Sequence, residues 1–250
     1  PLERTHQHPL SRISGEVRKL HARISATATG PGPIYLWKPL LYLILHSVPR
    51  VIVLATDVFL VEDIRRLWNI FDSFGSKQLI GLAEEQAPTY MEARALGGVG
   101  FNGGVQLLKL RKMRKSKEYG GIVERYADRK WVAMKEGGIG WLGDQTLYSW
   151  MSVNASEAAH IFFRLPCGWN RQTGTHAAGW KGFWRMHACD SPCELIHANG
   201  SPGHKAFIEA LKRDPPGSSC TSTLQRFRQK PEFRAGTAAR RALDMIVHTC

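Results

Sequence analysis

The chain has 250 residues, 43% of them hydrophobic, which is enough to bury one sizeable core. This composition excludes collagen-like, coiled-coil and wholly disordered proteins. The formal net charge of +13 favours a polyanionic partner, either nucleic acid, an anionic membrane or a phosphate-bearing substrate, and does not choose among the three.

The longest apolar run, Ile34 to Ala55, is interrupted by Lys38, Pro39, His46, Pro49 and Arg50. These polar and helix-breaking residues exclude a membrane span at this position. No signal peptide or anchor is apparent, so we expect any targeting segment to lie outside this chain.

The first segment, residues 1–33, is expected to be a helix followed by a linker. Ile13, Val17, Leu20 and Ile24 fall on one helical face, and the sequence ATATGPGP ends the helix. From residue 34 to 214, strand-like and helix-like stretches alternate, which predicts a single α/β domain with a mostly parallel sheet. The remaining residues, 215–250, are expected to form a basic and poorly ordered tail.

Within the α/β segment the expected elements follow in chain order. An apolar helical segment precedes the strand RVIVLAT, and the next helix is capped by Asp63. The strand QLIGLAE, a glycine-rich loop within FNGGVQLLKL, a basic helical stretch and a helix opening at Asp144 come next. The strands HIFFRLP and CELIHANG complete the domain.

Three polar residues stand at or just beyond expected strand ends, where open parallel sheets bind ligands: Asp57, Asn102 and His197. The Asp57 carboxylate suits a hard divalent cation, although a strand-end turn explains a lone Asp equally simply. Asn102 and its neighbouring glycines suit sugar hydroxyls or a plain tight turn. His197 is either a metal ligand or an ordinary loop histidine.

Other motifs are ambiguous in the same way. Asp144 suits a helix N-cap, and Lys205, close to His204, suits a leaving phosphate. The run from Lys109 to Lys117 is interpreted as a solvated helix face, because no nucleic-acid-binding motif accompanies it. The run HACDSPCELIH has unusual spacing for zinc, so we expect a disulfide between two of the following cysteines: Cys167, Cys189 and Cys193.

Five segments in this order resemble glycosyltransferase family 8, in its eukaryotic xylosyltransferase branch. They are RVIVLATDVFLVEDIRRLWNIF, similar to the family's D-x-D strand and following helix, FNGGVQLLKLRKMR, LGDQTLYSW, LPCGWNRQ and IHANG. The resemblance covers about Tyr35 to Phe207. It implies a Rossmann-like nucleotide-diphospho-sugar transferase fold of the GT-A type, with an incomplete amino-terminal nucleotide-binding half because the family's first strand is not found before Pro33.

The resemblance also implies roles for individual residues. Asp57 and His197 match metal ligands, and Lys38, Asp57 and Lys205 match groups that contact the donor nucleotide. The catalytic positions correspond to Asp144, Gln145 and Asn102, and the sugar-binding and acceptor-facing positions to Gly103, Trp169 and Asn170. The implied cofactor is Mn²⁺ or Mg²⁺.

The implied reaction is transfer of a sugar, xylose in this branch, from a UDP-sugar to a glycan or glycoprotein acceptor with retention of configuration. No side chain is an obvious covalent nucleophile, which favours front-face displacement. The implied location is the Golgi or endoplasmic reticulum lumen, with membrane attachment only through an anchor absent from this chain. Without any anchor, a cytoplasmic location is expected.

Two departures from the family pattern bear on activity. Ala55 stands where the D-x-D motif has its first Asp, and Thr146 replaces the last Asp of the D-Q-D segment. Loss of one anionic ligand should weaken metal binding. Two alternative functions therefore stay open: a catalytically inactive carbohydrate- or nucleotide-binding relative, and a basic nucleic-acid-binding protein, although no nucleic-acid partner is expected.

Overall fold

A computed structural model of the chain describes residues 13–25, 33–128, 142–153 and 158–200, with isolated positions between 225 and 244. The chain divides into two compact units. The first is formed by Pro1–Arg50 and Lys109–Leu147, and the second by Val51–Leu108 and Tyr148–Cys250. The expected boundaries after residues 33 and 214 stay predictions, and most of the expected tail lies outside the described residues.

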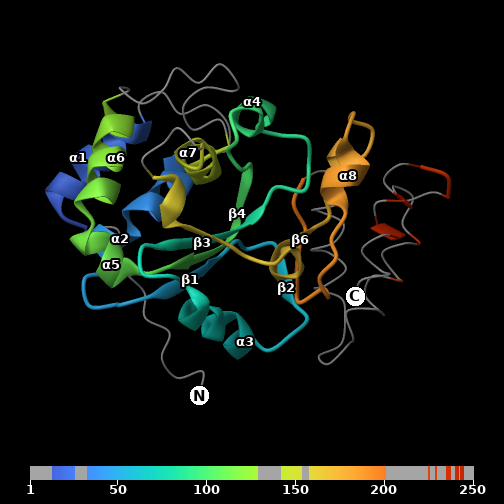
Figure 1. Cartoon of the computed structure of the whole chain (residues 1–250), viewed down its shortest axis with the longest axis horizontal. Helices are drawn as coiled ribbons and strands as arrows, with labels where there is room; N and C mark the ends of the chain where they lie inside the picture. The colour runs from blue at the N-terminus through green and yellow to red at the C-terminus, as the bar shows by residue number, and fades with distance from the viewer. Residues whose placement is uncertain are drawn as a thin grey trace. The chain divides into compact units, whose positions relative to one another are not determined.

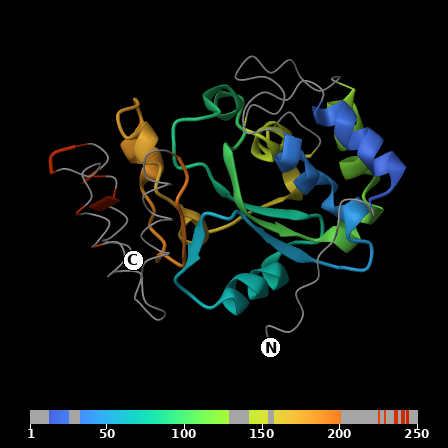
Figure 2. The same ribbon diagram turned by 180° about the vertical axis from the view of Figure 1, so that it is seen from behind.

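The described part of the first unit is helical. Its elements are α1 (Gly15–Ser25), the 3-10 helix η2 (Pro33–Leu40), α2 (Leu41–Ile44), α5 (Leu110–Lys115), α6 (Lys117–Ala127) and the first residues of α7 (Asp144–Met151). The α1 helix buries Val17, Leu20 and Ile24, as its periodicity predicts. It lies beside α6 (Figures 1 and 2), where Arg23 pairs with Glu124.

Two side chains tie the basic helices to the segment before the first strand. The Tyr119 hydroxyl donates to the Pro39 carbonyl at 2.9 Å. The Arg114 guanidinium donates to the carbonyl oxygens of Tyr42, Leu45 and Val48. Helix α5 buries Leu110 and Met113 and exposes its lysines. The basic run is therefore a partly buried helix with a solvated face, as expected.

The second unit contains two sheets. The four-stranded sheet has the order β1 (Val51–Leu54), β4 (Phe101–Leu108), β3 (Ile80–Glu84), β5 (Phe162–Arg164). The three-stranded sheet has the order β2 (Val58–Leu60), β7 (Leu195–His197), β6 (Arg171–Gln172). Only the β3–β5 and β6–β7 pairs are parallel, whereas β1–β4, β3–β4 and β2–β7 are antiparallel.

The prediction of a mostly parallel sheet was therefore wrong. It assumed that FNGGVQLLKL begins in a loop, but Phe101–Leu108 is a single buried strand that runs between β1 and β3 and opposes both. Alternation of strands and helices does not show which strands become neighbours, because β1 and β3 are separated in space by a strand that comes later in the sequence.

The helices of the second unit are short. They are α3 (Ile64–Asn69), η3 (Ile70–Ser73), α4 (Met91–Ala95), η4 (Ala159–Ile161), η5 (Cys167–Asn170), η6 (Thr175–Ala177) and α8 (Phe183–His187). Asp63 caps α3 by accepting a hydrogen bond from the Arg65 amide, as predicted. Helix α3 lies on one face of the four-stranded sheet (Figures 1 and 2), where Leu67 and Phe71 pack with Val105 and Leu107.

Candidate active site

Asp57 and His197 are brought together by strand pairing. In the antiparallel β2–β7 pair, Val58 lies opposite His197, and the Ala198 amide donates to the Asp57 carbonyl at 2.8 Å. The His197 Nε2 atom lies 3.3 Å from Asp57 Oδ1, and the two side chains are 8% and 15% exposed. The hypothesis that these residues share one site is thus supported by their geometry.

The local structure around Asp57 differs from the prediction. Strand β1 ends at Leu54, so Ala55 and Asp57 belong to the connection between β1 and β2 rather than to one continuous strand. The Ala55 amide still donates to the Gly104 carbonyl at 2.8 Å, which keeps the start of this connection on strand β4. Asp57 is therefore a turn residue and a neighbour of His197 at once.

The glycines of FNGGV serve a close approach between strands and side chain. A Cβ atom added to Gly104 would lie 2.2 Å from His197 Cε1 and 2.4 Å from His197 Nδ1. The imidazole therefore occupies the space that any larger residue at position 104 would need. Gly103, expected to contact the sugar, is buried and accepts a hydrogen bond from the Gln106 side chain at 3.0 Å.

A series of hydrogen bonds continues from His197 into the unit. His197 Nδ1 lies 3.0 Å from Asn170 Oδ1, and Asn170 Nδ2 donates to Asn102 Oδ1 at 2.9 Å. Asn102 Nδ2 donates to Glu85 Oε2, also at 2.9 Å. These side chains belong to four separate segments of the chain, and each whole residue is at most 7% exposed.

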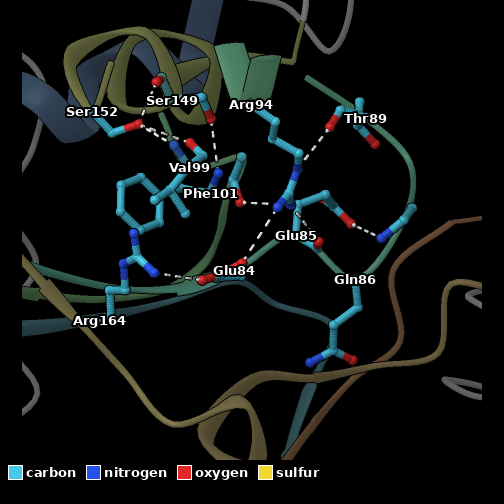
Figure 3. A network of polar contacts seen from close by, with 12 residues as sticks. Glu84, Glu85, Gln86, Thr89, Arg94, Val99, Phe101, Ser149, Ser152 and Arg164 are labelled. Atoms are coloured by element: carbon cyan, nitrogen blue, oxygen red, sulfur yellow. Dashed lines mark hydrogen bonds and ion pairs between the residues drawn. The ribbon is translucent and has the colours of Figure 1, made fainter. Parts of the chain in front are cut away.

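Glu85 and the adjacent carboxylate Glu84 meet an arginine network, which Figure 3 shows. Arg94 pairs with Glu84 at 3.3 Å and donates to the carbonyl oxygens of Glu85 and Gly100. Arg164 pairs with Glu84 from the other side at 3.3 Å. In the same view Ser149 and Ser152 of α7 hold the Phe101 and Val99 amides.

A cavity of about 630 Å³ opens beside this network within the second unit. Its walls combine the acidic residues Glu84, Glu85 and Asp190 with the basic residues Arg94, Arg164 and Arg185, and also include Gln86, Met91, Met186 and Cys167. Glu85 is thus a wall of the cavity and the far end of the hydrogen-bond series that begins at His197. Many planar polar groups around one cavity suit a ligand rich in hydroxyl groups.

Behind the cavity wall lies a fully buried guanidinium. Arg171 is 1% exposed and donates to Gln86 Oε1 and to the His187 carbonyl, both at 2.7 Å. Burial lowers the pKa of Arg171 to about 10, because removal from water disfavours the charged form. Gln86 Nε2 also donates to the Asn170 carbonyl at 3.2 Å, so this cluster supports the backbone of Asn170.

The first unit holds the other expected catalytic residues. Asp144 is the first residue of α7, and its Oδ1 atom lies 3.4 Å from the Lys38 ammonium. The two side chains are 2% and 17% exposed. Gln145 is half-buried in the same turn. Lys38 and Asp144 were predicted for separate roles, and the structure makes them partners in one ion pair.

Two expected substrate contacts find no exposed surface. Trp169 is 3% exposed and belongs to the hydrophobic core with Leu67 and Leu195. Asn170 is fully buried, and its amide is used between Asn102 and His197. The sequence LPCGWN therefore contributes core packing and hydrogen bonds here, in place of the acceptor-facing surface that the resemblance implied. Lys205 lies outside the described residues.

The cysteines support the disulfide interpretation. Cys167 and Cys189 form a disulfide with a Cα–Cα separation of 5.8 Å, which joins η5 to the residues after α8. Cys167 also lines the cavity. One pair among the three central cysteines was expected from the sequence, and this pair confirms it.

The capacity of the site for a metal ion can be tested from its donor atoms. Within the described ranges no group of three or more His, Cys, Asp or Glu residues is arranged to hold an ion, so Asp57 and His197 stand as a pair. Two ligands at right angles, each about 2.1 Å from an octahedral ion, lie about 3 Å apart. The 3.3 Å between Asp57 Oδ1 and His197 Nε2 is close to that spacing.

The sequence interpretation missed Glu85 and the arginine network. Glu84 and Glu85 follow the apolar run of β3, so the same signal that identified Asp57, a carboxylate after a buried strand, was present at this position. Neither Arg94 nor Arg164 carries a comparable signal, because their role arises only when β3, β5 and α4 meet.

Comparisons with known proteins support the resemblance. Mouse xyloside xylosyltransferase 1 is 30% identical to the chain over 182 residues, which cover 61% of this chain and 43% of that protein. Mouse xylosyl- and glucuronyltransferase LARGE2 is 33% identical over 161 residues, covering 61% of this chain and 22% of that protein. The chain thus spans less than half the length of these curated relatives. No protein-family model matches it.

Solved structures confirm the GT-A fold. The crystal structure of mouse xyloside xylosyltransferase 1 in its apo form aligns with a TM-score of 0.64 and 25% identity, covering 79% of this chain and 74% of that chain. The galactosyltransferase LgtC, in complex with donor and acceptor sugar analogues, aligns with a TM-score of 0.53 and 14% identity over 92% of this chain and 73% of that chain. The second likeness concerns the fold alone.

Proposed function

We propose that this chain, a homologue of the eukaryotic xylosyltransferases of glycosyltransferase family 8, is the transferase region of an enzyme that moves a sugar, most specifically xylose, from a UDP-sugar to a glycan or glycoprotein. The observation that carries the proposal is the pair of donor atoms on Asp57 and His197, which face each other at 3.3 Å at one end of a buried hydrogen-bond series.

Asp57 and His197 would hold a divalent cation, Mn²⁺ or Mg²⁺. When bound, the cation offsets the negative charge that develops on the departing diphosphate. The Asp57 carboxylate and the His197 Nε2 lone pair are suitable donors, since hard cations take carboxylate oxygens and manganese also accepts imidazole. Lys38 and Lys205 are proposed to contact the donor phosphates.

The remaining residues position the reactants. Asn102 and Gly103 are proposed at the donor sugar, and Asp144 with Gln145 beside the reaction centre. No covalent nucleophile is proposed, so retention follows from front-face displacement, in which the leaving phosphate oxygen takes the acceptor proton. The role of the protein in this route is to orient the two sugars and to stabilise charge.

The cavity beside Glu85 is the proposed place for the acceptor. Its carboxylates and guanidiniums present hydrogen-bond acceptors and donors to vicinal hydroxyl groups, and Met91 and Met186 present apolar surface to a sugar ring. Its volume of about 630 Å³ exceeds what one monosaccharide needs. This supports an oligosaccharide or a glycosylated peptide as the acceptor.

A second candidate function is favoured by one specific observation. Ala55 supplies no carboxylate, and the described residues near Asp57 supply no third His, Cys, Asp or Glu ligand. A relative that binds a glycan or a nucleotide without transferring the sugar would have such a site. The basic nucleic-acid-binding alternative has no comparable support beyond the net charge of +13.

Calorimetric titration separates these functions. UDP is titrated into the chain with and without Mn²⁺, and a random oligonucleotide and a xylose-containing oligosaccharide are titrated separately. Metal-dependent UDP binding, together with release of xylose from UDP-xylose, supports the transferase. Binding of the oligosaccharide without metal-dependent UDP binding supports the inactive relative. Salt-sensitive oligonucleotide binding alone would exclude both.

The proposed location is the lumen of the Golgi or the endoplasmic reticulum. The Cys167–Cys189 disulfide supports an oxidising compartment. None of the helices in the described ranges has the length and apolar character needed to cross a bilayer. Location is tested by expressing the natural full-length protein with a tag and staining permeabilised cells for the tag beside a Golgi marker.

A further inference from the structure

The hydrogen-bond series between Glu85 and His197 has a direction, and that direction fixes the protonation of the imidazole. We infer that His197 is held as the tautomer with its proton on Nδ1, so that the Nε2 lone pair faces Asp57, and that Asn170 is the positioning residue that imposes this state. The inference rests on the proposed function for its metal ion, whereas its geometry is independent of any ligand.

The direction is set by a backbone amide. The Gly104 N–H can only donate, and it lies 2.9 Å from one end of the Asn102 side-chain amide, which must therefore be the oxygen. The nitrogen of the same amide then faces Glu85 Oε2 at 2.9 Å, where a carboxylate accepts. Asn102 is thus fixed at both ends by groups that cannot reverse their roles.

Asn170 transmits this orientation to His197. The atom of Asn170 that lies 2.9 Å from Asn102 Oδ1 must be the nitrogen, because that oxygen requires a donor. The other end of the Asn170 amide is therefore its oxygen, and it lies 3.0 Å from His197 Nδ1. An oxygen at that distance accepts a hydrogen bond, so Nδ1 carries a proton.

Burial makes the reversed arrangement costly. Asn102, Asn170 and His197 are 3%, 0% and 7% exposed, so water is largely excluded from replacing a lost partner. If His197 carried its proton on Nε2 alone, the Nδ1 lone pair would face the Asn170 oxygen, and two acceptors would be opposed in a buried place. Gly104 also restricts movement of the ring, since it leaves no more space than the imidazole fills.

The consequence concerns the quality of the metal ligand. An imidazole that donates through Nδ1 presents Nε2 as a lone pair of fixed direction, which is the usual arrangement of a histidine that binds a metal. Asn170 then acts on the cation only through His197. This role replaces the acceptor contact that the sequence resemblance implied for Asn170.

The first test observes the tautomer in the metal-free chain. Two-bond ¹H–¹⁵N correlation spectra of histidine-labelled protein are recorded at about pH 8, where an ordinary histidine is neutral, and the His197→Gln variant assigns the His197 signals. The Nδ1–H pattern is expected. A ring protonated on Nε2 alone, or on both nitrogens, would overturn the inference whether or not the chain binds metal.

The second test measures how Asn170 affects the metal. In the Asn170→Ala variant we expect Mn²⁺-dependent UDP affinity to fall about 10- to 100-fold, as is typical for loss of a hydrogen bond to a ligand histidine. Asn69→Ala, an exposed substitution at the end of α3, is the matched control. Unchanged affinity in a folded Asn170→Ala variant would contradict the positioning role.

The two tests separate the inference from the proposed function. If the wild-type chain binds no Mn²⁺ but shows the Nδ1–H pattern, the proposed function fails and the hydrogen-bond direction stands. If Asn170→Ala does not fold, Asn170→Asp keeps an acceptor for His197 Nδ1 but opposes a carboxylate oxygen to Asn102 Oδ1. The Nδ1–H signal should then persist at position 197, and its loss would contradict the inference.

Discussion

The contact between Gly104 and His197 gives a prediction that is worked directly from the coordinates. In Gly104→Ala the new Cβ atom would lie 2.2 Å from His197 Cε1, whereas ordinary contact begins at 3.4 Å. The ring must therefore retreat by about 1.2 Å, which breaks its 3.0 Å hydrogen bond to Asn170 and its 3.3 Å contact with Asp57.

The cost has two parts. Overpacking in a buried place costs about 1–3 kcal/mol, and loss of the Asn170 hydrogen bond adds about 1 kcal/mol. We expect Gly104→Ala to lower the free energy of unfolding by about 2–4 kcal/mol, and to abolish Mn²⁺-dependent UDP binding. Urea unfolding measures the first effect and calorimetry the second.

A double-mutant cycle isolates the cause. With His197→Ala already in place, the ring is absent and Gly104→Ala should cost less than about 1 kcal/mol, because the listed clash has been removed. Gly120→Ala on α6, where an added Cβ meets nothing within 4 Å, controls for the loss of glycine and should stabilise by about 0.5–1 kcal/mol. The same cost of Gly104→Ala in both backgrounds would refute the proposed contact.

Three further predictions follow from the same structure. Ala55→Asp should strengthen Mn²⁺-dependent UDP binding at least about tenfold, or 1.4 kcal/mol, and His197→Ala should abolish the gain; unchanged affinity in a folded Ala55→Asp variant would mean that position 55 does not reach the site. Replacing both Cys167 and Cys189 by Ala should lower the free energy of unfolding in urea by about 2–4 kcal/mol under oxidising conditions, and an equal change measured with reductant present would contradict this. Burial raises the pKa of Tyr42 from 10.0 to about 12, so the neutral phenol stabilises the fold below pH 10 and this contribution is lost as the pH rises to about 12. Tyr42→Phe should therefore lose less stability over that window, and identical pH profiles would disprove the assignment.

Local sequence patterns predicted the features that depend on neighbouring residues. The buried face of α1 follows from the spacing of Val17, Leu20 and Ile24, and the start of α3 from the capping chemistry of Asp63. Each of these needs only a few consecutive residues and the backbone hydrogen bonds between them. The strands β1, β3 and β7 were recognised for the same reason, because each is a short apolar run.

Strand order could not be derived in this way. The sheet places β4 between β1 and β3, so the neighbour of each strand depends on which surfaces are buried after the chain has collapsed. The glycines of FNGGV added to the error, since they are typical of a turn but here allow an imidazole to approach a strand. A glycine that makes room for a distant side chain has the same sequence signature as one that allows a turn.

The site itself was partly visible in the sequence. Asp57, Asn102 and His197 were expected at one site, and they lie within one unit and are linked through Asn170. The connection could not be foreseen, because Asn170 lies in a short 3-10 helix whose sequence suggested an exposed role. Glu85 was missed although it follows a buried strand, since no recognised motif included it.

The choice between a turn residue and a metal ligand at Asp57 is therefore not a real alternative. The turn between β1 and β2 positions the Asp57 carboxylate, and the β2–β7 register brings the His197 imidazole opposite to it. With Ala at position 55, a cation would depend on these two side chains, so each lost or rotated donor removes a larger share of the protein's contribution than in a site with three ligands. A site of this kind requires that His197 not rotate or change its tautomer, and Gly104 and Asn170 are the residues that prevent both changes.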